Sequence, residues 1–230
     1  MTELSAMMKL AKNPLRSEAE LIERTQGIEG LSFLQLASFL GLSLPSDPLK
    51  RKGFIGKAIE LALGTTAGSK SMPDFCNLGI ELKTLPLNHL GKPAESTFIT
   101  TIPLLTIHHQ AWKTSHCYAK LKRVLWIPIE GSNDLPFADR RIGRGLLWSP
   151  SKEDEEILEK DWVLLTSMIA TGLLQEIDAS VGEYLQIRPK ALNGKSLCYG
   201  FDESGGKILT MPRGFYLRSS FTGKLLSGRQ

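Results

Sequence analysis

The chain has 230 residues, of which 42% are hydrophobic and 23% are charged, and its net charge is +4. This balance is ordinary for a folded globular protein, so neither a disordered chain nor a membrane-embedded one is indicated. The three cysteines are odd in number and no two have C-x-x-C spacing, which argues against a disulfide framework or a zinc ribbon and fits a reducing cytosol.

The first fourteen residues, MTELSAMMKLAKNP, carry scattered charges and no continuous apolar stretch. They do not resemble a signal peptide, and no apolar run in the chain approaches the length that spans a bilayer. We therefore expect a cytoplasmic protein with no membrane partner.

Charge is distributed unevenly along the chain. Residues 113–144 contain seven basic and three acidic side chains, residues 182–230 contain eight basic and three acidic, and residues 150–178 contain eight acidic and two basic. This asymmetry fits a basic cleft for nucleic acid backed by an acidic outer helix, although solvated surfaces explain it equally well.

Two helices are predicted near the N-terminus. Ser17 and Glu20 have the spacing of a capping box and open a helix over residues 17–30 that carries regularly spaced apolar residues. Residues 32–41 repeat the same pattern and end in glycine, so they predict a second helix.

Residues 52–63 predict a third helix. Ile55 and Ile59 lie on its apolar stripe, Gly64 follows as a C-terminal cap, and Glu60 falls on the polar side. Taken by itself, a glutamate at such a position is a solvated surface residue.

Strands dominate the next region, and the alternation of strands with helices predicts an α/β fold. The expected strands lie within residues 79–105, with Gly91 in the turn and Phe98 on the second strand, and over residues 122–129, 183–188 and 207–217. A long helix with an acidic first turn is expected over residues 151–174, and a polar linker over residues 194–206.

The segment DFCNLGIELK (74–83) contains the most informative motif. On a strand, Ile80 and Leu82 would face the core, while Glu81 and Lys83 share the other face. Asp74 lies just before this strand and could bring its carboxylate toward Glu81 to hold a hard cation. This is the residue set of a magnesium-dependent nuclease, but the spacing alone also occurs by chance on solvated strand edges.

Phosphodiester cleavage needs an activated water and neutralisation of charge that builds up in the transition state. Carboxylates holding a metal supply most of this. Lys83 would either orient or deprotonate the attacking water, or offset charge on the phosphate oxygens, and the sequence leaves both roles open.

Longer blocks along most of the chain resemble the MutH family of mismatch-repair endonucleases. The blocks are KGFIGKAIELALGTTAGSK (52–70), DFCNLGIELKTLP (74–86), TSHCYAKLKRVLWIPIEG (114–131), LLWSP (146–150), GEYLQIRPKA (182–191) and ILTMPRGFYL (208–217). The resemblance implies a restriction-endonuclease-like fold with a central mixed sheet flanked by helices and two arms around a DNA-binding cleft. It implies a single endonuclease domain over residues 1–230, with a catalytic part at about 1–108 and a recognition part at about 109–230.

The same resemblance assigns the cleavage residues. Pro73 and Asp74 match the first half of the superfamily signature literally, and Glu60 would join Asp74 and Glu81 in holding one or two Mg2+ ions, with Lys83 beside them. A lysine matching Lys120 lies near the scissile phosphate in the family and supports cleavage.

Several residues are candidates for DNA contact. Phe98 matches an aromatic residue implicated in engaging DNA, although a core position is an equally good interpretation. The basic Lys120, Lys122 and Arg123 are expected at the start of a strand, as phosphate-contacting residues often are. The complete set is Lys52, Phe98, Lys120, Lys122, Arg123, Arg188, Pro189, Lys190 and Tyr216.

Arg188, at the end of an alternating strand, is the candidate for base reading, because its planar fork matches the two acceptors on the major-groove edge of guanine. Tyr216 alternates with Phe215 and Leu217, so its ring should face away from the core. By resemblance, Tyr216 and Pro189 line the adenine position, where a methyl group would be excluded and only the bare strand nicked.

The resemblance predicts a Mg2+-dependent monomer with one active site, which nicks the unmethylated strand of double-stranded DNA at hemimethylated or unmethylated GATC. Activation would come from the MutL ATPase after MutS has recognised a mismatch. The alternatives are a GATC-specific restriction endonuclease, a DNA-binding module without catalysis, and an unrelated metal-dependent phosphoesterase.

Overall fold

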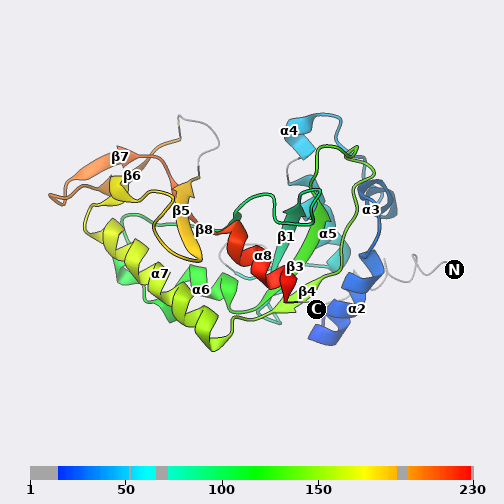
Figure 1. Ribbon diagram of the computed structural model, residues 1–230, viewed down its shortest axis with the longest axis horizontal. Coiled ribbons are helices and arrows are strands. Elements are labelled where there is room, and N and C mark those ends of the chain that lie inside the picture. The colour runs from blue at the N-terminus through cyan, green and yellow to red at the C-terminus, as the bar shows by residue number, and fades with distance from the viewer. Residues whose placement is uncertain (1–14, 52, 66–71, 191–195, 229–230) are drawn as a thin grey trace. The chain divides into compact units, whose positions relative to one another are not determined.

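The structure is a computed structural model that describes residues 15–51, 53–65, 72–190 and 196–228. The chain divides into two compact units, each built from two stretches of sequence. Unit 1 comprises Met1–Ala94 and Arg123–Ser149, and unit 2 comprises Glu95–Lys122 and Pro150–Gln230. Both units contain helices and strands, so the predicted α/β class is confirmed (Figure 1).

Unit 1 has a small mixed sheet and four helices in its described part. The helices are α2 (Glu18–Ile28), α3 (Phe33–Phe39), α4 (Pro48–Arg51) and α5 (Phe54–Leu63). The strands are β1 (Glu81–Leu87), β3 (Val124–Glu130) and β4 (Leu146–Trp148), in the order β1-β3-β4. β1 runs parallel to β3 and β4 runs antiparallel to it, which makes β1 an edge strand.

The core of unit 1 explains this arrangement. β3 is buried along six of its seven residues, as expected for a central strand with apolar side chains on both faces. Ile59 and Leu63 of α5 pack in one cluster with Ile80 and Leu82 around the start of β1 and with Leu125 of β3. This burial fixes α5 against the strand that carries the motif.

Unit 2 has a three-stranded antiparallel sheet, a hairpin and several helices. Its sheet has the order β2-β8-β5, with β2 (Thr97–Thr101), β8 (Arg213–Leu217) and β5 (Leu185–Pro189), and its hairpin pairs β6 (Cys198–Phe201) with β7 (Lys207–Thr210). The helices are α6 (His116–Leu121), α7 (Lys152–Ala170) and α8 (Ser219–Ser227), with short 3-10 turns at Ile107–His109, Trp112–Thr114 and Leu174–Glu176.

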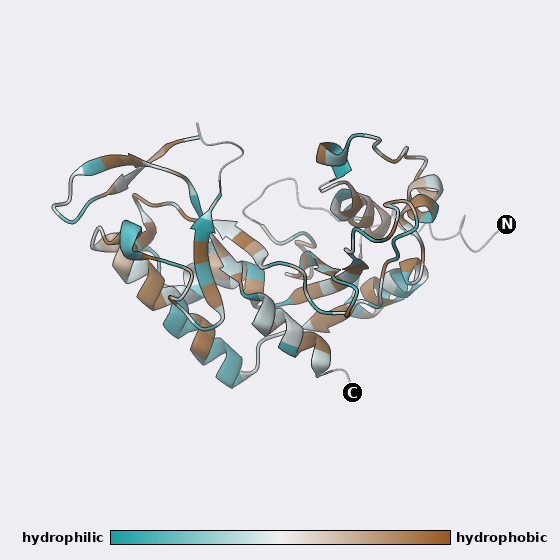
Figure 2. Cartoon of the chain, turned by 45° about the horizontal axis from the view of Figure 1, so that its top comes forward, coloured by the Kyte–Doolittle hydropathy of each residue, from teal (hydrophilic) through white to brown (hydrophobic). Residues whose placement is uncertain are grey.

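The α7 helix fixes the start of β5. Its apolar and polar turns alternate in Figure 2, and its inward side includes the buried Asp161. The Asp161 carboxylate accepts hydrogen bonds from the N–H groups of Glu183, Tyr184 and Leu185, at 2.6 to 2.9 Å. A buried carboxylate is stable only with such partners, so this contact ties β5 to the helix.

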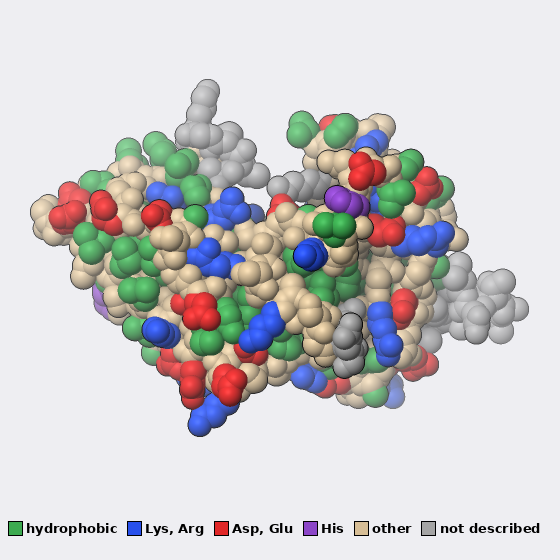
Figure 3. Space-filling model, in the orientation of Figure 1, with side chains coloured by type: hydrophobic (Ala, Val, Ile, Leu, Met, Phe, Trp, Pro, Cys, Tyr) green, Lys and Arg blue, Asp and Glu red, His purple; other side chains and the backbone are tan. Residues whose placement is uncertain are grey.

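The β6–β7 hairpin exposes apolar side chains on one face. Tyr199 lies opposite Leu209, and the two are 55% and 60% exposed. Hydrophobic side chains are visible over this region in the space-filling view (Figure 3). On the other face, Gly200 lies near Leu104 and Leu174 and is buried.

The predicted N-terminal helices are confirmed. Ser17 accepts the N–H of Glu20 as the cap of α2, and the capping box between Ser32 and Gln35 is complete. The third helix begins at Phe54, two residues later than predicted, because Gly53 has the left-handed φ of 85°, which a right-handed helix cannot contain. Lys52 lies outside the described residues.

Other element predictions were wrong in part. Residues 207–217 form two strands rather than one, since Met211 and Pro212 interrupt them and Pro212 has no N–H to donate. The expected linker contains β6, and the helices α6 and α8 were not predicted. The long helix α7 was predicted but ends at Ala170, before the left-handed Gly172.

The basic group at residues 120–123 does not lie at the start of a strand. Lys120 is in the last turn of α6, Lys122 is the C-cap residue of that helix, and β3 begins at Val124. In the described part of the chain, no helix is both long and apolar enough to cross a membrane.

Candidate active site and recognition surface

The start of β1 holds the Asp74 carboxylate in place. The N–H of Glu81 donates to the carbonyl of Arg123 next to β3 (3.0 Å), so the next N–H, that of Leu82, points away from the sheet. Asp74 Oδ2 accepts that N–H at 2.8 Å, and a bridge between Phe75 and Ile80 closes the intervening turn. The edge position of β1 thus places the Asp74 carboxylate beside the first residues of the motif strand.

Glu81 and Lys83 share one face of β1, as the alternation predicts. Lys83 Nζ lies 2.8 Å from Glu81 Oε1, and the two side chains are only 15% and 3% exposed. Ile80 and Leu82 are buried in the core of unit 1. An ion pair so little exposed to solvent is costly unless each charge has its partner, so the two residues depend on each other.

Glu60 projects from the neighbouring helix α5 and is half-buried. Burial raises the pKa of this carboxyl, and the negative charges of Asp74 and Glu81 raise it further, while Lys57 and Lys83 oppose them. Glu60 therefore lies within electrostatic range of both motif carboxylates. Crowded carboxylates of this kind are relieved by a cation.

The donor set fits a hard cation that prefers oxygen ligands, such as Mg2+. Across the residues that the structure describes, no three carboxylate, histidine or cysteine side chains are already gathered as a formed metal site. Asp74 is turned to the Leu82 N–H, and Glu81 to Lys83. Binding would therefore require the side chains of Glu60, Asp74 and Glu81 to converge.

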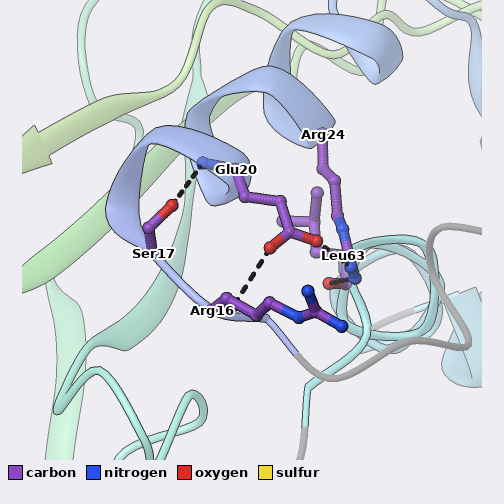
Figure 4. A network of polar contacts seen from close by, with 5 residues as sticks. All are labelled: Arg16, Ser17, Glu20, Arg24 and Leu63. Atoms are coloured by element: carbon purple, nitrogen blue, oxygen red, sulfur yellow. Dashed lines mark hydrogen bonds and ion pairs between the residues drawn. The ribbon is translucent and has the colours of Figure 1, made fainter.

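A polar network holds the far end of α5 (Figure 4). Arg24 of α2 donates from Nη1 to the carbonyl of Leu63 (3.1 Å) and from Nη2 to Glu20 (2.6 Å), and Glu20 also accepts the N–H of Arg16. The Arg16 N–H and Arg24 lower the pKa of Glu20. A cation on a terminal carbonyl suits a helix C-terminus, so this network stabilises the helix that carries Glu60.

The sheet of unit 2 brings predicted recognition residues together on one face. Phe98, Tyr216 and Gln186 are direct neighbours across β2, β8 and β5. The Phe98 and Tyr216 rings pack edge to face, with centroids 5.3 Å apart. The opposite face of this sheet carries the buried Phe215 and Leu217, so the Tyr216 ring faces away from the core, as predicted.

Two basic side chains cover these rings. Lys190 Nζ lies 4.0 Å from the centroid of Phe98, and Arg188 Cζ lies 5.9 Å from the centroid of Tyr216. Arg188 Nη1 also donates to Ser96 Oγ at 2.7 Å. Lys and Arg side chains are visible over the β5 and β8 region in Figure 3. The result is a positive surface with aromatic faces, which suits nucleic acid.

Gly214 makes room for this packing. A Cβ at this position would lie 2.8 Å from Phe98 Cε2 and 3.2 Å from the carbonyl of Thr100. Phe98 is half-buried and touches Tyr216 and Lys190, so its ring supports the recognition face without being enclosed in the core. Neither Gly214 nor Ser96 was identified from the sequence, because their roles arise only when β2, β8 and β5 pair.

The Tyr216 hydroxyl remains protonated at neutral pH. Burial raises its pKa above the ordinary value of 10, Arg188 opposes this, and Glu95 adds to it. A neutral hydroxyl can both donate and accept a hydrogen bond, which suits contact with a base edge.

The remaining candidates lie in different surroundings. Lys120 is only 6% exposed on α6, while Lys122 and Pro189 are exposed. Arg123 donates to both carboxylate oxygens of Glu18 with one guanidinium edge, from Nε to Oε1 at 2.9 Å and from Nη2 to Oε2, and its Nη1 donates to Ser149 Oγ. Arg123 therefore joins the start of α2 to the end of β4, a structural contact that the sequence did not predict.

Comparison with known proteins gives consistent matches. A family model described as DNA mismatch repair enzyme MutH matches residues 63–161. The chain is 47% identical over 211 residues to the DNA mismatch repair protein MutH of Vibrio campbellii, covering 92% of this chain and 93% of that protein. It is 46% identical over 215 residues to the protein of the same name from Escherichia coli (strain K12 / DH10B), covering 94% of each.

Proposed function

The chain belongs to the MutH family and is a methyl-directed mismatch-repair endonuclease that nicks DNA at hemimethylated GATC sites, and we propose that the motif at the start of β1 performs the cleavage. The observation that carries this assignment is the arrangement around β1, where Asp74 is tied to Leu82 and Glu81 is paired with Lys83. Enzymes of this family are typically metal-dependent.

In the proposed mechanism, Asp74, Glu81 and Glu60 would hold Mg2+, as one or two ions. When bound, the metal would supply Lewis-acid stabilisation of the phosphate and would lower the pKa of water. Lys83, which lies beside Glu81, would orient or deprotonate the attacking water or offset charge on the phosphate oxygens. Lys120 supports cleavage near the scissile phosphate.

Unit 2 would read the site. Arg188 addresses guanine with its planar fork, and Tyr216 and Pro189 line the adenine position and exclude its methyl group. Lys190 and Phe98 hold the neighbouring backbone and base surface, and Lys122 of unit 2 is a further phosphate contact. Lys52 and Arg123 of unit 1 complete the phosphate contacts, Arg123 in exchange for its pairing with Glu18. The support for this assignment is that Phe98, Arg188, Lys190 and Tyr216 lie together on one face of the β2-β8-β5 sheet.

We also propose that the two units form one endonuclease domain, in which unit 1 cleaves and unit 2 recognises double-stranded DNA. The enzyme would act as a monomer in the bacterial cytoplasm, nick one strand per encounter, and be activated by MutL after mismatch recognition by MutS. These assignments follow from family membership.

The decisive test is nicking of matched duplexes with one GATC site, unmethylated, hemimethylated or fully methylated, in the presence of MutL and with Mg2+ titrated. Glu81→Gln and Lys83→Ala should lose nicking of bare strands by about 100-fold or more while retaining DNA binding. Lys92→Ala removes an exposed lysine from the turn after β1 and serves as the control.

Each other outcome identifies a rival. Double-strand cleavage by a dimer indicates a restriction endonuclease, binding without cleavage indicates a non-catalytic module, and cleavage independent of GATC contradicts the recognition assignment. Cleavage that survives both substitutions contradicts the assignment of the catalytic motif.

A further inference from the structure

The guanidinium of Arg188 is held before any DNA arrives. Its Nη1 donates to Ser96 Oγ at 2.7 Å, and its Cζ lies 5.9 Å from the centroid of Tyr216. Arg188 is nevertheless exposed on β5, where an arginine normally samples many rotamers. Contacts with Ser96, just before β2, and with Tyr216 of β8 therefore limit the orientation of the guanidinium.

We propose that Ser96 is a positioning residue for site recognition, which sets the orientation of the Arg188 guanidinium. This inference rests on the proposed function, in which Arg188 reads guanine. Ser96 lies directly before β2, an edge strand of the sheet, and reaches Arg188 near the end of β5 on the opposite edge. The Arg188 backbone pairs with Gly214, whose neighbour on β2 is Thr101 and not Ser96. The Arg188 side chain therefore reaches Ser96 across the face that carries the Tyr216 ring.

The choice of nitrogen determines how the base is read. With Nη1 turned to Ser96, the neighbouring donors Nε and Nη2 form the edge that can face a base. They are adjacent, parallel N–H groups, as the O6 and N7 acceptors of guanine require. Ser96 would thus leave the Nε and Nη2 edge of the guanidinium available for guanine, while its hydroxyl accepts the hydrogen bond from Nη1.

Orientation before binding reduces the conformational entropy that the arginine loses in the complex. Loss of one hydrogen bond of this kind should weaken recognition by about 3- to 10-fold. The loss should be confined to cognate DNA, because a site without guanine at that position gains nothing from the oriented fork.

The test compares Ser96→Ala, Ser96→Thr, Arg188→Ala and the double variant Ser96→Ala/Arg188→Ala in the full chain with MutL and Mg2+. Substrates are duplexes carrying GATC or the same site with adenine in place of guanine. Ser220→Ala, which removes an exposed hydroxyl from α8 of the same unit, is the matched control. Values of kcat and KM and the melting temperature are measured for each variant.

We expect Ser96→Ala to raise KM for GATC about 3- to 10-fold, with kcat, nicking of the altered site and melting temperature close to wild type. Ser96→Thr should restore recognition because it keeps the hydroxyl, and Ser96→Ala should add nothing in the Arg188→Ala background. The role of Ser96 would be overturned if Ser96→Ala kept the full preference for GATC. It would also be overturned if Ser96→Ala weakened recognition equally in the wild-type and Arg188→Ala backgrounds. Undiminished preference in Arg188→Ala would instead overturn the proposed role of Arg188 itself.

Discussion

Asp161 provides a strong test of how β5, the strand that carries the proposed base-reading residue Arg188, is held. Its Oδ2 accepts the N–H groups of Glu183, Tyr184 and Leu185 within 2.9 Å, and the residue is 4% exposed. In Asp161→Asn, one amide oxygen can keep these contacts but loses the charge. The difference between charged and neutral acceptors is about 1 kcal/mol per bond, so we expect a loss of about 2 to 3 kcal/mol. Asp161→Ala leaves the donors unpaired and should cost about 4 kcal/mol or more.

Urea unfolding followed by tryptophan fluorescence measures this loss, since Trp162 is the buried neighbour of Asp161 and reports exposure. Glu159→Gln is the matched control, because Glu159 lies on the same helix and is exposed. The control should change the free energy of unfolding by less than about 0.5 kcal/mol.

A loss in Asp161→Ala no larger than that of the control would refute this account of the contact. In Asp161→Asn, sequence discrimination should also fall, because Arg188 lies on the strand whose start Asp161 holds. Weakened protein stability with GATC recognition fully intact would show that β5 is positioned by its pairing with β8 alone.

Three further predictions follow from the two units. Glu60→Gln should abolish most nicking but raise the melting temperature of the metal-free protein, because the raised pKa of Glu60 means that its ionised form opposes folding. This destabilisation is absent below the unfolded pKa of about 4.3 and grows as pH rises through the folded pKa. The difference in melting temperature between the variant and wild type should therefore be largest at neutral pH. Gly214→Ala should weaken DNA binding about 10-fold or more by displacing the Phe98 ring, which filter binding measures, and unchanged binding would contradict the packing. Glu20→Gln should lower stability at neutral pH, and its difference from wild type in urea unfolding should vanish as pH falls through the lowered pKa of Glu20; a difference that persists in acid would exclude the charge of Glu20 as its source.

The proposed cleavage site in unit 1 would be stable before a cation binds, because its charged groups already have internal partners. The charge of Glu81 is compensated by Lys83, and Asp74 is compensated by a backbone N–H. Burial first, and the negative charges of Asp74 and Glu81 next, raise the pKa of Glu60, so the ionised form of Glu60 is destabilised in the metal-free protein. Metal binding would replace these internal partners by the cation. The free energy needed to separate them would then be offset by the binding of metal and substrate.

Local sequence patterns determined much of this protein. The alternation of apolar and charged residues over 80–83 predicted that Ile80 and Leu82 face the core and that Glu81 and Lys83 share the other face, and the caps at Ser17, Ser32 and Gly64 predicted helix ends. It did not predict that Glu81 is itself buried or that it pairs with Lys83. These features depend on residues within one or two turns or strand repeats of each other, so a short window of sequence contains the necessary information.

The tertiary structure alone decided the contacts between distant segments. Ser96 meets Arg188 across 92 positions, Arg123 meets Glu18 across 105, and Arg24 caps the helix that ends at Leu63. Each unit also combines two separate stretches of chain, so the units cannot be separated by a single boundary in the sequence. The physical reason is that strand pairing and packing place these residues together, and neither is set by the composition around any one of them.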